Sequence, residues 1–547
     1  MLNARIPGIK SQALVGFGFF FLTVCIAWGI GIKIVNDDVR SMTYGALIFA
    51  GCVVAVTALR HWRTGFYMFF VWMILEDLVR KYMGNGLVLF FGKDVLLGLV
   101  YLSFFAAVRK GREKTFRPPF FLFLSLFFWL GVLQVFNQNS PSIWYGLLGI
   151  KTYFYYIPLL FVGYALVRTD EELGTFLSAN ALLAIVIGFV GIVQSILGNS
   201  FLNPRNLAPE LEELGNLQKS TTTGQIFNLP DSVFVSSGRY AEYLTIAFII
   251  AMGAVGYLLL YSKRHRKWVF SAIGLLGVAT LLSGNRGSVV SMLMTAAFLS
   301  IGFLWGSPWI KQQVHRTTKA VSRSVLVATL GLGVLFTLFP QEAGSRLEYY
   351  SETLLPSSAE YQLGNRIWDY PVANFLSVFS QPNWGIGNGI GTASLGTQYV
   401  AKLTGAPAPE IGVEEGYGTL ILEMGILAPL LWILWTAFLL YYSWRVIRRL
   451  RETRLFPIAL AIGWYAFVVL FLWTFASLAG YENYICNAFL WLLVGVLFGL
   501  PNLLVNAPDQ PVVQSIPGRI PGLGSVVTAS PNGSMKSDHR TTMSRQV

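Results

Sequence analysis

Long apolar segments separated by short polar connections run along almost the whole chain. Each segment approaches the roughly 20 residues that a helix needs to cross a bilayer core of about 30 Å. Hydropathy therefore predicts about fourteen transmembrane helices, within a range of about twelve to fourteen. The predicted spans are 11–32, 43–60, 64–80, 87–108, 119–137, 143–168, 173–197, 240–261, 268–283, 287–306, 324–340, 419–443, 456–479 and 485–503.

The composition indicates the same class of protein. Of the 547 residues, 54% are hydrophobic and 12% are charged, whereas a soluble protein carries about 25% charged residues. The first apolar segment is too long for the core of a signal peptide, and no small-residue cleavage site follows it. We therefore expect an all-α polytopic membrane protein whose first helix is retained.

Basic residues are concentrated in every second connection between the predicted helices. Cytoplasmic loops of membrane proteins carry an excess of Lys and Arg, so both termini are predicted to be cytoplasmic. The net charge of +13 is then mostly an orientation signal, and no nucleic-acid partner is expected. The basic connections are HWR (61–63), RKGREKTFR (109–117), RTDEE (168–172), KRHRK (263–267), KQQVHRTTKAVSR (311–323) and RVIRRLRETR (445–454).

Two long connections fall on the outer side, and a loop as long as the second is usually functional. Within it, QPNWGIGNGIGT (381–392) is either a set of tight turns where backbone approaches a ligand or a flexible surface loop. The regions predicted are helices one to eleven with an outer connection at 198–239 (1–340), a large periplasmic loop with room for its own helices (341–418), helices twelve to fourteen (419–503), and a disordered cytoplasmic tail rich in Pro, Ser and Gly (504–547).

Three isolated arginines share the outer side of the predicted membrane. Arg239, Arg286 and Arg366 each lie beside a glycine or one residue from one. The planar guanidinium matches phosphate oxygens with two parallel hydrogen bonds, which a lysine does not do. These residues are therefore candidate ligands of a lipid-linked phosphate or diphosphate. The alternative for Arg239 and Arg286 is an anchor that reaches to membrane phosphates.

Charged residues also lie inside the predicted spans, all in their outer halves. Ionisable groups within spans are costly and usually face a bundle interior or a water-filled cavity. A polar cavity open to the outer leaflet is the prediction, and structural ion pairing is the alternative. The candidates for the lining are Glu76, Asp77, Lys93, Asp94 and Lys151.

Four stretches together resemble the superfamily of O-antigen ligases and O-antigen polymerases. The resemblance covers roughly residues 225–440, and its motifs are short, so that their order and membrane side carry it. The stretches are FVSSGRYAEYL (234–244), LLSGNRGSVVSML (281–293), GNRIWDYPVANFLS (364–377) with PNWGIGNG (382–389), and GVEEGYGTLILEMGILAPLLW (412–432).

This resemblance implies a GT-C-like, metal-independent glycosyltransferase of the bacterial inner membrane, with no cofactor and an active site facing the periplasm. The implied donor is a glycan on undecaprenyl diphosphate, and the acceptor is a second lipid-linked glycan or lipid A core. The role of holding the diphosphate passes to Arg239, Arg286 and Arg366. Membrane lipid, a chain-length regulator and a flippase are further candidate partners.

One departure from the ligases favours a polymerase of surface polysaccharide or exopolysaccharide. Ligases carry a histidine eleven residues before the glycine that matches Gly425, and this chain has Glu414 there, followed by Glu415. We therefore expect Glu414 or Glu415 to activate the acceptor hydroxyl and Arg286 to stabilise the leaving diphosphate. Glu414 as a solvated loop acid, a ligase, and a flippase of lipid-linked oligosaccharide are the alternatives.

Overall fold

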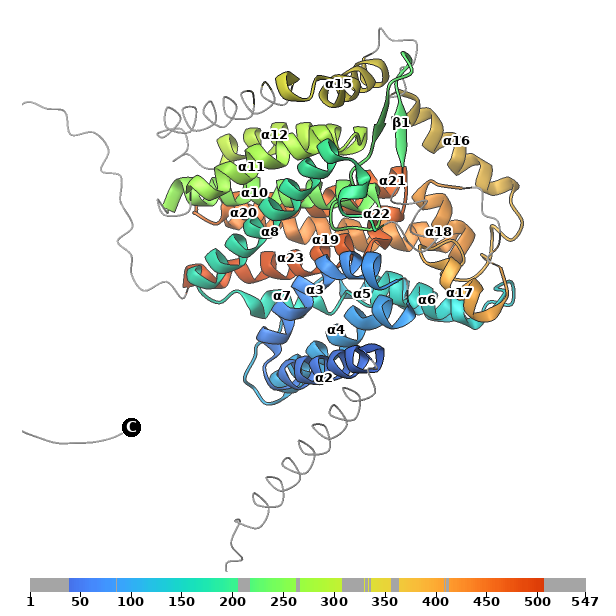
Figure 1. Ribbon diagram of the computed structural model, residues 1–547. Coiled ribbons are helices and arrows are strands. Elements are labelled where there is room, and N and C mark those ends of the chain that lie inside the picture. The colour runs from blue at the N-terminus through green and yellow to red at the C-terminus, as the bar shows by residue number, and fades with distance from the viewer. Residues whose placement is uncertain are drawn as a thin grey trace, which may run out of the picture. The chain divides into compact units, whose positions relative to one another are not determined.

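The computed structural model describes residues 39–84, 86–204, 217–261, 266–306, 329, 333, 336–355, 364–407, 409 and 413–505 (Figure 1). The chain up to Val505 forms one unit by its internal contacts. Helices make up most of this part, with one short hairpin. The predicted helix 11–32, most of the predicted span 324–340 and nearly all of the tail lie outside the described residues.

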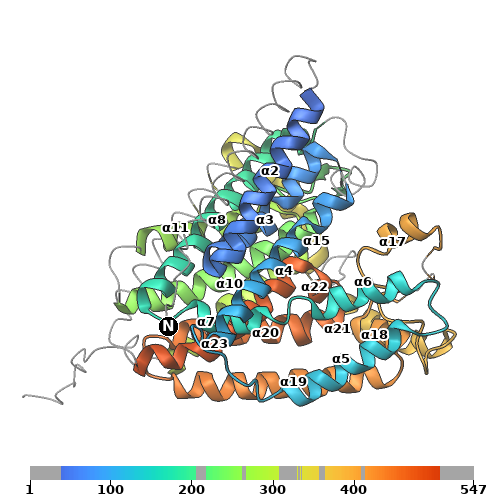
Figure 2. The same cartoon turned by 90° about the horizontal axis from the view of Figure 1, so that it is seen from below.

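Most of the helices are labelled in Figures 1 and 2. The elements are α2 (Val39–Arg60), α3 (Trp62–Met83), α4 (Leu87–Arg109), α5 (Phe121–Val135), α6 (Ile143–Phe154), α7 (Leu159–Leu166), α8 (Asp170–Leu197), η1 (Asn199–Phe201), β1 (Gln218–Ser220), β2 (Ile226–Asn228), α10 (Ser237–Tyr261), α11 (Arg266–Leu282), α12 (Arg286–Gly306), α15 (Pro340–Leu354), the π-helix η2 (Asn365–Asp369), α16 (Tyr370–Ser377), η3 (Val378–Ser380), α17 (Thr397–Thr404), α18 (Gly416–Met424), α19 (Leu427–Arg449), α20 (Phe456–Phe467), the π-helix η4 (Val468–Trp473), α21 (Thr474–Ala476), α22 (Ala479–Glu482) and α23 (Tyr484–Val505).

Eight helices in the described residues are long and apolar enough to cross a membrane. The all-α polytopic class is therefore confirmed, while the number fourteen stays a prediction. The eight are Leu89–Arg109, Ile143–Leu166, Asp170–Leu197, Ser237–Tyr257, Arg286–Gly306, Leu427–Arg449, Phe456–Ala476 and Tyr484–Leu504, and the shorter apolar helices are Phe49–Arg60, Phe121–Val135 and Ser271–Leu282.

Two predicted spans are interrupted in the structure. The span 419–443 is divided at Gly425, whose φ of +82° is favourable only for glycine, so α18 ends and α19 begins anew. The span 143–168 is divided by a turn before α7, where Pro158 cannot donate a helical hydrogen bond. Apolar length alone predicts neither break, because both sides of each break are apolar.

The basic connections 61–63, 109–117, 168–172 and 445–454, which lie in the described residues, gather at one end of the helices, which we call the basic end. The Arg63 guanidinium donates to Glu172 at 2.8 Å, joining the start of α3 to the start of α8. The Trp62 indole donates to Glu113 at 3.1 Å, and the Glu452 amide donates to the Gly306 carbonyl at 2.9 Å. The alternation predicted from the charge pattern is therefore present in the described residues.

The opposite end, which we call the site end, is closed by the hairpin and the helices of the outer loop (Figure 1). Strands β1 and β2 pair antiparallel, with Gln218 opposite Asn228. Helix α15 is tied to them by Arg346, which is 1% exposed and donates to the Leu282 carbonyl at 2.8 Å and to the Asn228 carbonyl at 2.9 Å. This clamp fixes α15 beside the start of α12.

Candidate functional site

A cavity of about 600 Å³ lies at the site end, between α10, α12, α15 and the chain around α22. Its volume is within the range of small-molecule sites. Among the described residues that line it, Arg286 and Lys219 are basic and Glu242 is acidic. The lining comprises Lys219, Leu229, Gly238, Ala241, Glu242, Thr245, Gly284, Asn285, Arg286, Gly287, Ser288, Val290, Ser291, Tyr349, Thr353, Leu354, Ile367, Trp473, Ala476, Ser477, Ala479 and Gly480.

Helix α10 contributes one face to this cavity. Gly238, Ala241, Glu242 and Thr245 are three or four residues apart, so they lie on the same side of the helix. Gly238, Ala241 and Thr245 have small side chains, which leave room for the cavity. Glu242 is the charged residue of this face, and its half-buried carboxylate accepts hydrogen bonds from the Asn483 amide and, at 3.6 Å, from the Cys486 thiol.

The start of α12 forms an adjoining wall, where the Ser288 hydroxyl donates to the Ala241 carbonyl of α10 at 3.1 Å. Gly284 has φ +69°, and a Cβ atom there would lie 2.4 Å from Leu229, so only glycine fits this turn. Asn285 then caps the helix, since its side-chain oxygen accepts from the Ser288 amide at 3.0 Å. Arg286 is the first residue of the 21-residue helix, and its guanidinium lies 5.5 Å from the centre of the Tyr349 ring. The positive end of the helix dipole and a cation therefore border the same cavity.

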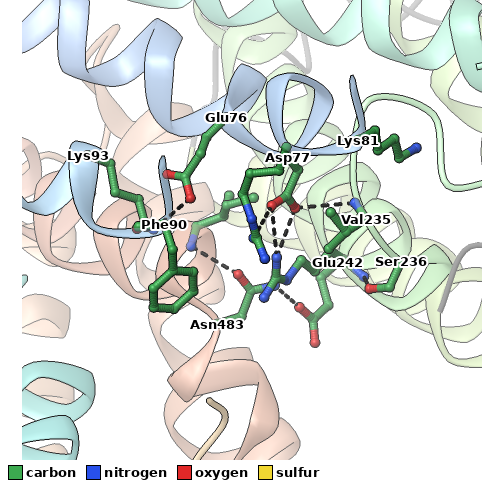
Figure 3. A network of polar contacts seen from close by, with 12 residues as sticks. Glu76, Asp77, Lys81, Phe90, Lys93, Val235, Ser236, Glu242 and Asn483 are labelled. Carbon is green, nitrogen blue, oxygen red and sulfur yellow. Dashed lines mark hydrogen bonds and ion pairs between the residues drawn. The ribbon is translucent and has the colours of Figure 1, made fainter. Parts of the chain in front are cut away.

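Beside Glu242, α10 also borders a buried ionic network centred on Asp77 (Figure 3). Asp77 is fully buried and accepts from Arg239 Nη1 with both oxygens, at 3.0 and 2.9 Å. It also accepts from Arg80 Nη1 at 2.9 Å and from the Val235 amide at 3.3 Å. Arg239 therefore holds Asp77 and is not among the cavity residues.

The other predicted lining residues form further buried ion pairs beside it. Lys93 donates to Glu76 at 2.9 Å, and both side chains are fully buried. Lys151 lies 3.0 Å from Asp94. None of these four, nor Asp77, borders the 600 Å³ cavity in the described residues. The structure thus shows the ion-pairing alternative for this set.

Comparisons with family models, curated proteins and solved structures gave no match. The chemistry of the residues themselves must therefore carry the functional interpretation.

The two glutamates predicted as bases lie outside the cavity lining. Glu415 is 1% exposed, and its carboxylate accepts from the Tyr417 and Gly418 amides, which makes it the N-cap of α18. Burial raises the pKa of Glu415 to about 7. Glu414 is exposed, and its amide donates to Asn374 at 3.2 Å. Both therefore serve the local structure here, and their catalytic role stays a prediction.

Arg366 lies in the π-helix η2, and its side chain is outside the described part. The next residue, Ile367, lines the cavity. Of the three predicted diphosphate ligands, the structure therefore brings Arg286 to the cavity, places the backbone of Arg366 next to a lining residue, and directs Arg239 into the ionic network.

The glycine-rich stretch 381–392 has an exposed first part, 382–386, and a buried second part, 387–392. Gly391 has φ +85°, and a Cβ atom there would lie 2.1 Å from the Tyr145 carbonyl oxygen. The carbonyl of Gly387 accepts from the Asn137 and Asn139 amides, each at 3.0 Å. The stretch lies against α6 and the end of α18, so its glycines permit close approach to protein backbone. The tight turns predicted from the sequence are therefore present, and in the buried part they approach protein backbone. A role in ligand binding stays a prediction.

Two buried carboxylates hold the chain that follows this stretch. Glu423 accepts from the Tyr153 hydroxyl at 2.8 Å, the Ala393 amide at 2.8 Å and the Ser394 hydroxyl at 3.0 Å. Glu482 accepts from the Leu395 amide at 2.8 Å, and burial together with the charge of Glu423 raises its pKa to about 8. Neither lines the cavity, so they support the fold around it.

Sequence reasoning missed Glu242, although it lies three residues after Arg239 in the same motif. The available signal was helical spacing, which places Glu242 with Gly238 and Ala241 on a face of small residues. A cation at a helix start, a carboxylate in the same cavity and apolar walls can together hold an anionic ligand and accept a proton. Among the described residues no three His, Cys, Asp or Glu side chains gather to hold a metal ion.

Proposed function

We propose that this protein polymerises glycan repeat units carried on a polyprenyl diphosphate, and that the reaction occurs in the 600 Å³ cavity. The observation that carries the proposal is the placement of Arg286, at the start of α12, and of Glu242, from α10, on the walls of one cavity. The resemblance of residues 234–244 and 281–293 to the O-antigen ligases and polymerases suggests the reaction, which is glycosyl transfer from a lipid-linked diphosphate. A GT-C-like fold with about fourteen spans belongs to the same proposal.

The reaction needs a base and an anion site. The acceptor hydroxyl oxygen attacks the anomeric carbon of the donor sugar, the bond from that carbon to the diphosphate oxygen breaks, and the hydroxyl proton passes to Glu242. The negative charge that develops on the leaving diphosphate is stabilised by the Arg286 guanidinium and by the positive end of α12. Attack opposite the leaving group inverts the anomeric centre.

The Asp77–Arg239 pair has a positioning role in this mechanism. Arg239 and Glu242 are both in the first two turns of α10. The two hydrogen bonds from Arg239 to Asp77 hold that helix to α3, and thereby fix the direction in which Glu242 faces. In place of Glu414 or Glu415, Glu242 is then the base that the geometry favours.

The orientation follows from the positive-inside rule. The basic end, with Arg63 and the connection 445–454, is cytoplasmic, so the cavity faces the periplasm of a bacterial inner membrane. An outer location fits a donor that is already carried on lipid. Transfer to lipid A core in the same cavity would make the protein a ligase. A flippase is less well supported, since the described cavity lies at one end of the helices.

The test is reconstitution of the full chain in liposomes with a lipid-linked repeat unit, with polymer length measured on gels. We expect Arg286→Ala to lower kcat/KM by about 100-fold or more, with Arg286→Lys between it and the wild type. Glu242→Gln should lower kcat and remove the acidic limb of the pH–rate profile. Arg449→Gln, at the basic end, is the matched control and should be unaffected.

Normal polymer from both Arg286→Ala and Glu242→Gln would refute the assignment of the cavity. Activity on a lipid A core acceptor but none on a second repeat unit would favour the ligase.

A further inference from the structure

A second pocket, of about 420 Å³, lies at the basic end between the end of α2, the start of α3 and the end of α4. Ser103 of α4 donates to the Leu59 carbonyl at 2.9 Å, which fixes α4 against the end of α2. Trp62, 6% exposed, forms part of the wall. The lining comprises Leu59, Arg60, His61, Trp62, Arg63, Thr64, Ser103, Ala106, Ala107, Lys110, Arg112 and Glu113.

The charges around this pocket are unbalanced. Arg60, Lys110 and Arg112 are exposed at its rim, and within the described ranges none of the three has an ion pair. Glu113 is the acid of the lining, and it already accepts from the Trp62 indole and pairs with Arg168. Arg63, the fourth strong cation of the lining, forms an ion pair with Glu172. Three positive charges therefore face one concave site that has no carboxylate left to neutralise them.

Orientation alone does not account for this arrangement. The positive-inside rule predicts cations near the cytoplasmic ends of helices. Arg445, Arg448 and Arg449 at the end of α19 agree with it, and none of the three lines the 420 Å³ pocket. In the 420 Å³ pocket, by contrast, the cations surround a hollow whose walls include Leu59, Ala106 and Ala107. An anion with an apolar part fits such a site, since its charge meets the rim and its chain meets the wall.

We propose that this pocket binds the phosphate headgroup of an anionic phospholipid of the cytoplasmic leaflet. Basic pockets between transmembrane helices on that side are suited to lipid headgroups. The acyl chains continue along the lipid-facing side of α2, where Phe49, Val53 and Val56 are exposed. This inference is independent of the proposed glycosyl transfer, because it concerns the opposite end of the helices.

The test uses the purified full chain in detergent, titrated with dioctanoyl phosphatidylglycerol, with dioctanoyl phosphatidylcholine, or with inorganic phosphate. Native mass spectrometry counts bound lipid, and the thermal shift gives the affinity. We expect phosphatidylglycerol to bind and stabilise, while phosphatidylcholine and inorganic phosphate do not. Each cation near a membrane surface strengthens binding about fivefold, so the triple variant Arg60→Gln, Lys110→Gln, Arg112→Gln should bind phosphatidylglycerol about 100-fold more weakly.

The matched control is Arg445→Gln, Arg448→Gln, Arg449→Gln, which removes the same charge from the same end. It should bind phosphatidylglycerol like the wild type. An equal loss in this control, or no preference for phosphatidylglycerol over phosphatidylcholine, would overturn the proposal. Equal stabilisation by inorganic phosphate would also overturn it, by showing a site for the free ion. If the triple variant does not fold, Arg112→Gln alone should still weaken binding about fivefold.

Discussion

The replacement of Asp77 by Asn tests whether the buried network stabilises the fold. The Asp77 carboxylate is fully buried and accepts hydrogen bonds from Arg239, Arg80 and the Val235 amide. An amide of the same shape keeps an oxygen for the Val235 amide but removes the negative charge. Arg239 then loses its carboxylate partner, and Arg80 loses one of its hydrogen bonds and keeps the one to the Tyr399 hydroxyl. Arg80 is 1% exposed, so it cannot turn to water.

Removal of one partner from a buried ion pair costs about 3–5 kcal/mol. The Arg239 side chain keeps 22% exposure and lies 5.2 Å from the Tyr484 ring, so part of its charge stays solvated. We therefore expect Asp77→Asn to lower the free energy of unfolding by about 3 kcal/mol, the low end of that range. The assay is unfolding by sodium dodecyl sulfate in mixed micelles, followed by circular dichroism.

Two further variants make the result specific. Asp170→Asn removes the partner of Arg454 from an ion pair that is partly exposed, so its cost should stay below about 1 kcal/mol. Asp77→Asn combined with Arg239→Gln removes one unpaired cation and should recover part of the loss. If Asp77→Asn costs no more than Asp170→Asn, the network does not stabilise the fold in the manner argued here.

Two other predictions concern the outer loop. The folded protein holds the Glu415 proton more tightly than the unfolded chain, because burial raises its pKa from 4.5 to about 7. Stability should therefore fall by about 2 kcal/mol from about pH 5 to about pH 8. Glu415→Gln should remove this fall in thermal melts, and an unchanged slope would contradict the assignment. Gly391→Ala should destabilise by about 1–3 kcal/mol because of its positive φ and the Tyr145 carbonyl. Gly385→Ala meets no atom within 4 Å and should be neutral in the same melts, so equal losses would refute the packing argument.

The alternation of helices was predictable because it depends on local quantities. The length of an apolar run predicts whether it can span a membrane, and the charge of a connection predicts its side. Both quantities come from the sequence without knowledge of the fold. The gathering of Arg63, Glu113 and the connection 445–454 at one end follows from them. The breaks at Gly425 and Pro158 were not predicted, since apolar runs continue on both sides and only the backbone direction changes.

The candidate site was predictable only in part, because pairing is not a local property. Arg239 and Arg286 look alike in sequence, because each lies next to a glycine just before an apolar run. In the structure Arg239 meets Asp77, a residue 162 positions away, whereas Arg286 borders the cavity. Glu415 is a similar case. The apolar run that begins after it indicates a helix start, and in the structure Glu415 is the N-cap of that helix. The family resemblance instead predicts a catalytic base at this position.

The outer-half charges were expected to line one water-filled cavity, and the structure instead places all five of them in buried or partly buried ion pairs. An ionisable group within a span is tolerated when it is paired or when it faces water or ligand. Asp77, Glu76 and Lys93 are paired. Arg286 and Glu242 line the cavity. Helix α10 contributes to both the ionic network and the cavity, since Arg239 and Glu242 are less than one turn apart on it. A change in the network that rotates α10 would therefore move the Glu242 carboxylate within the cavity, so Asp77→Asn should lower transfer activity even where the protein still folds.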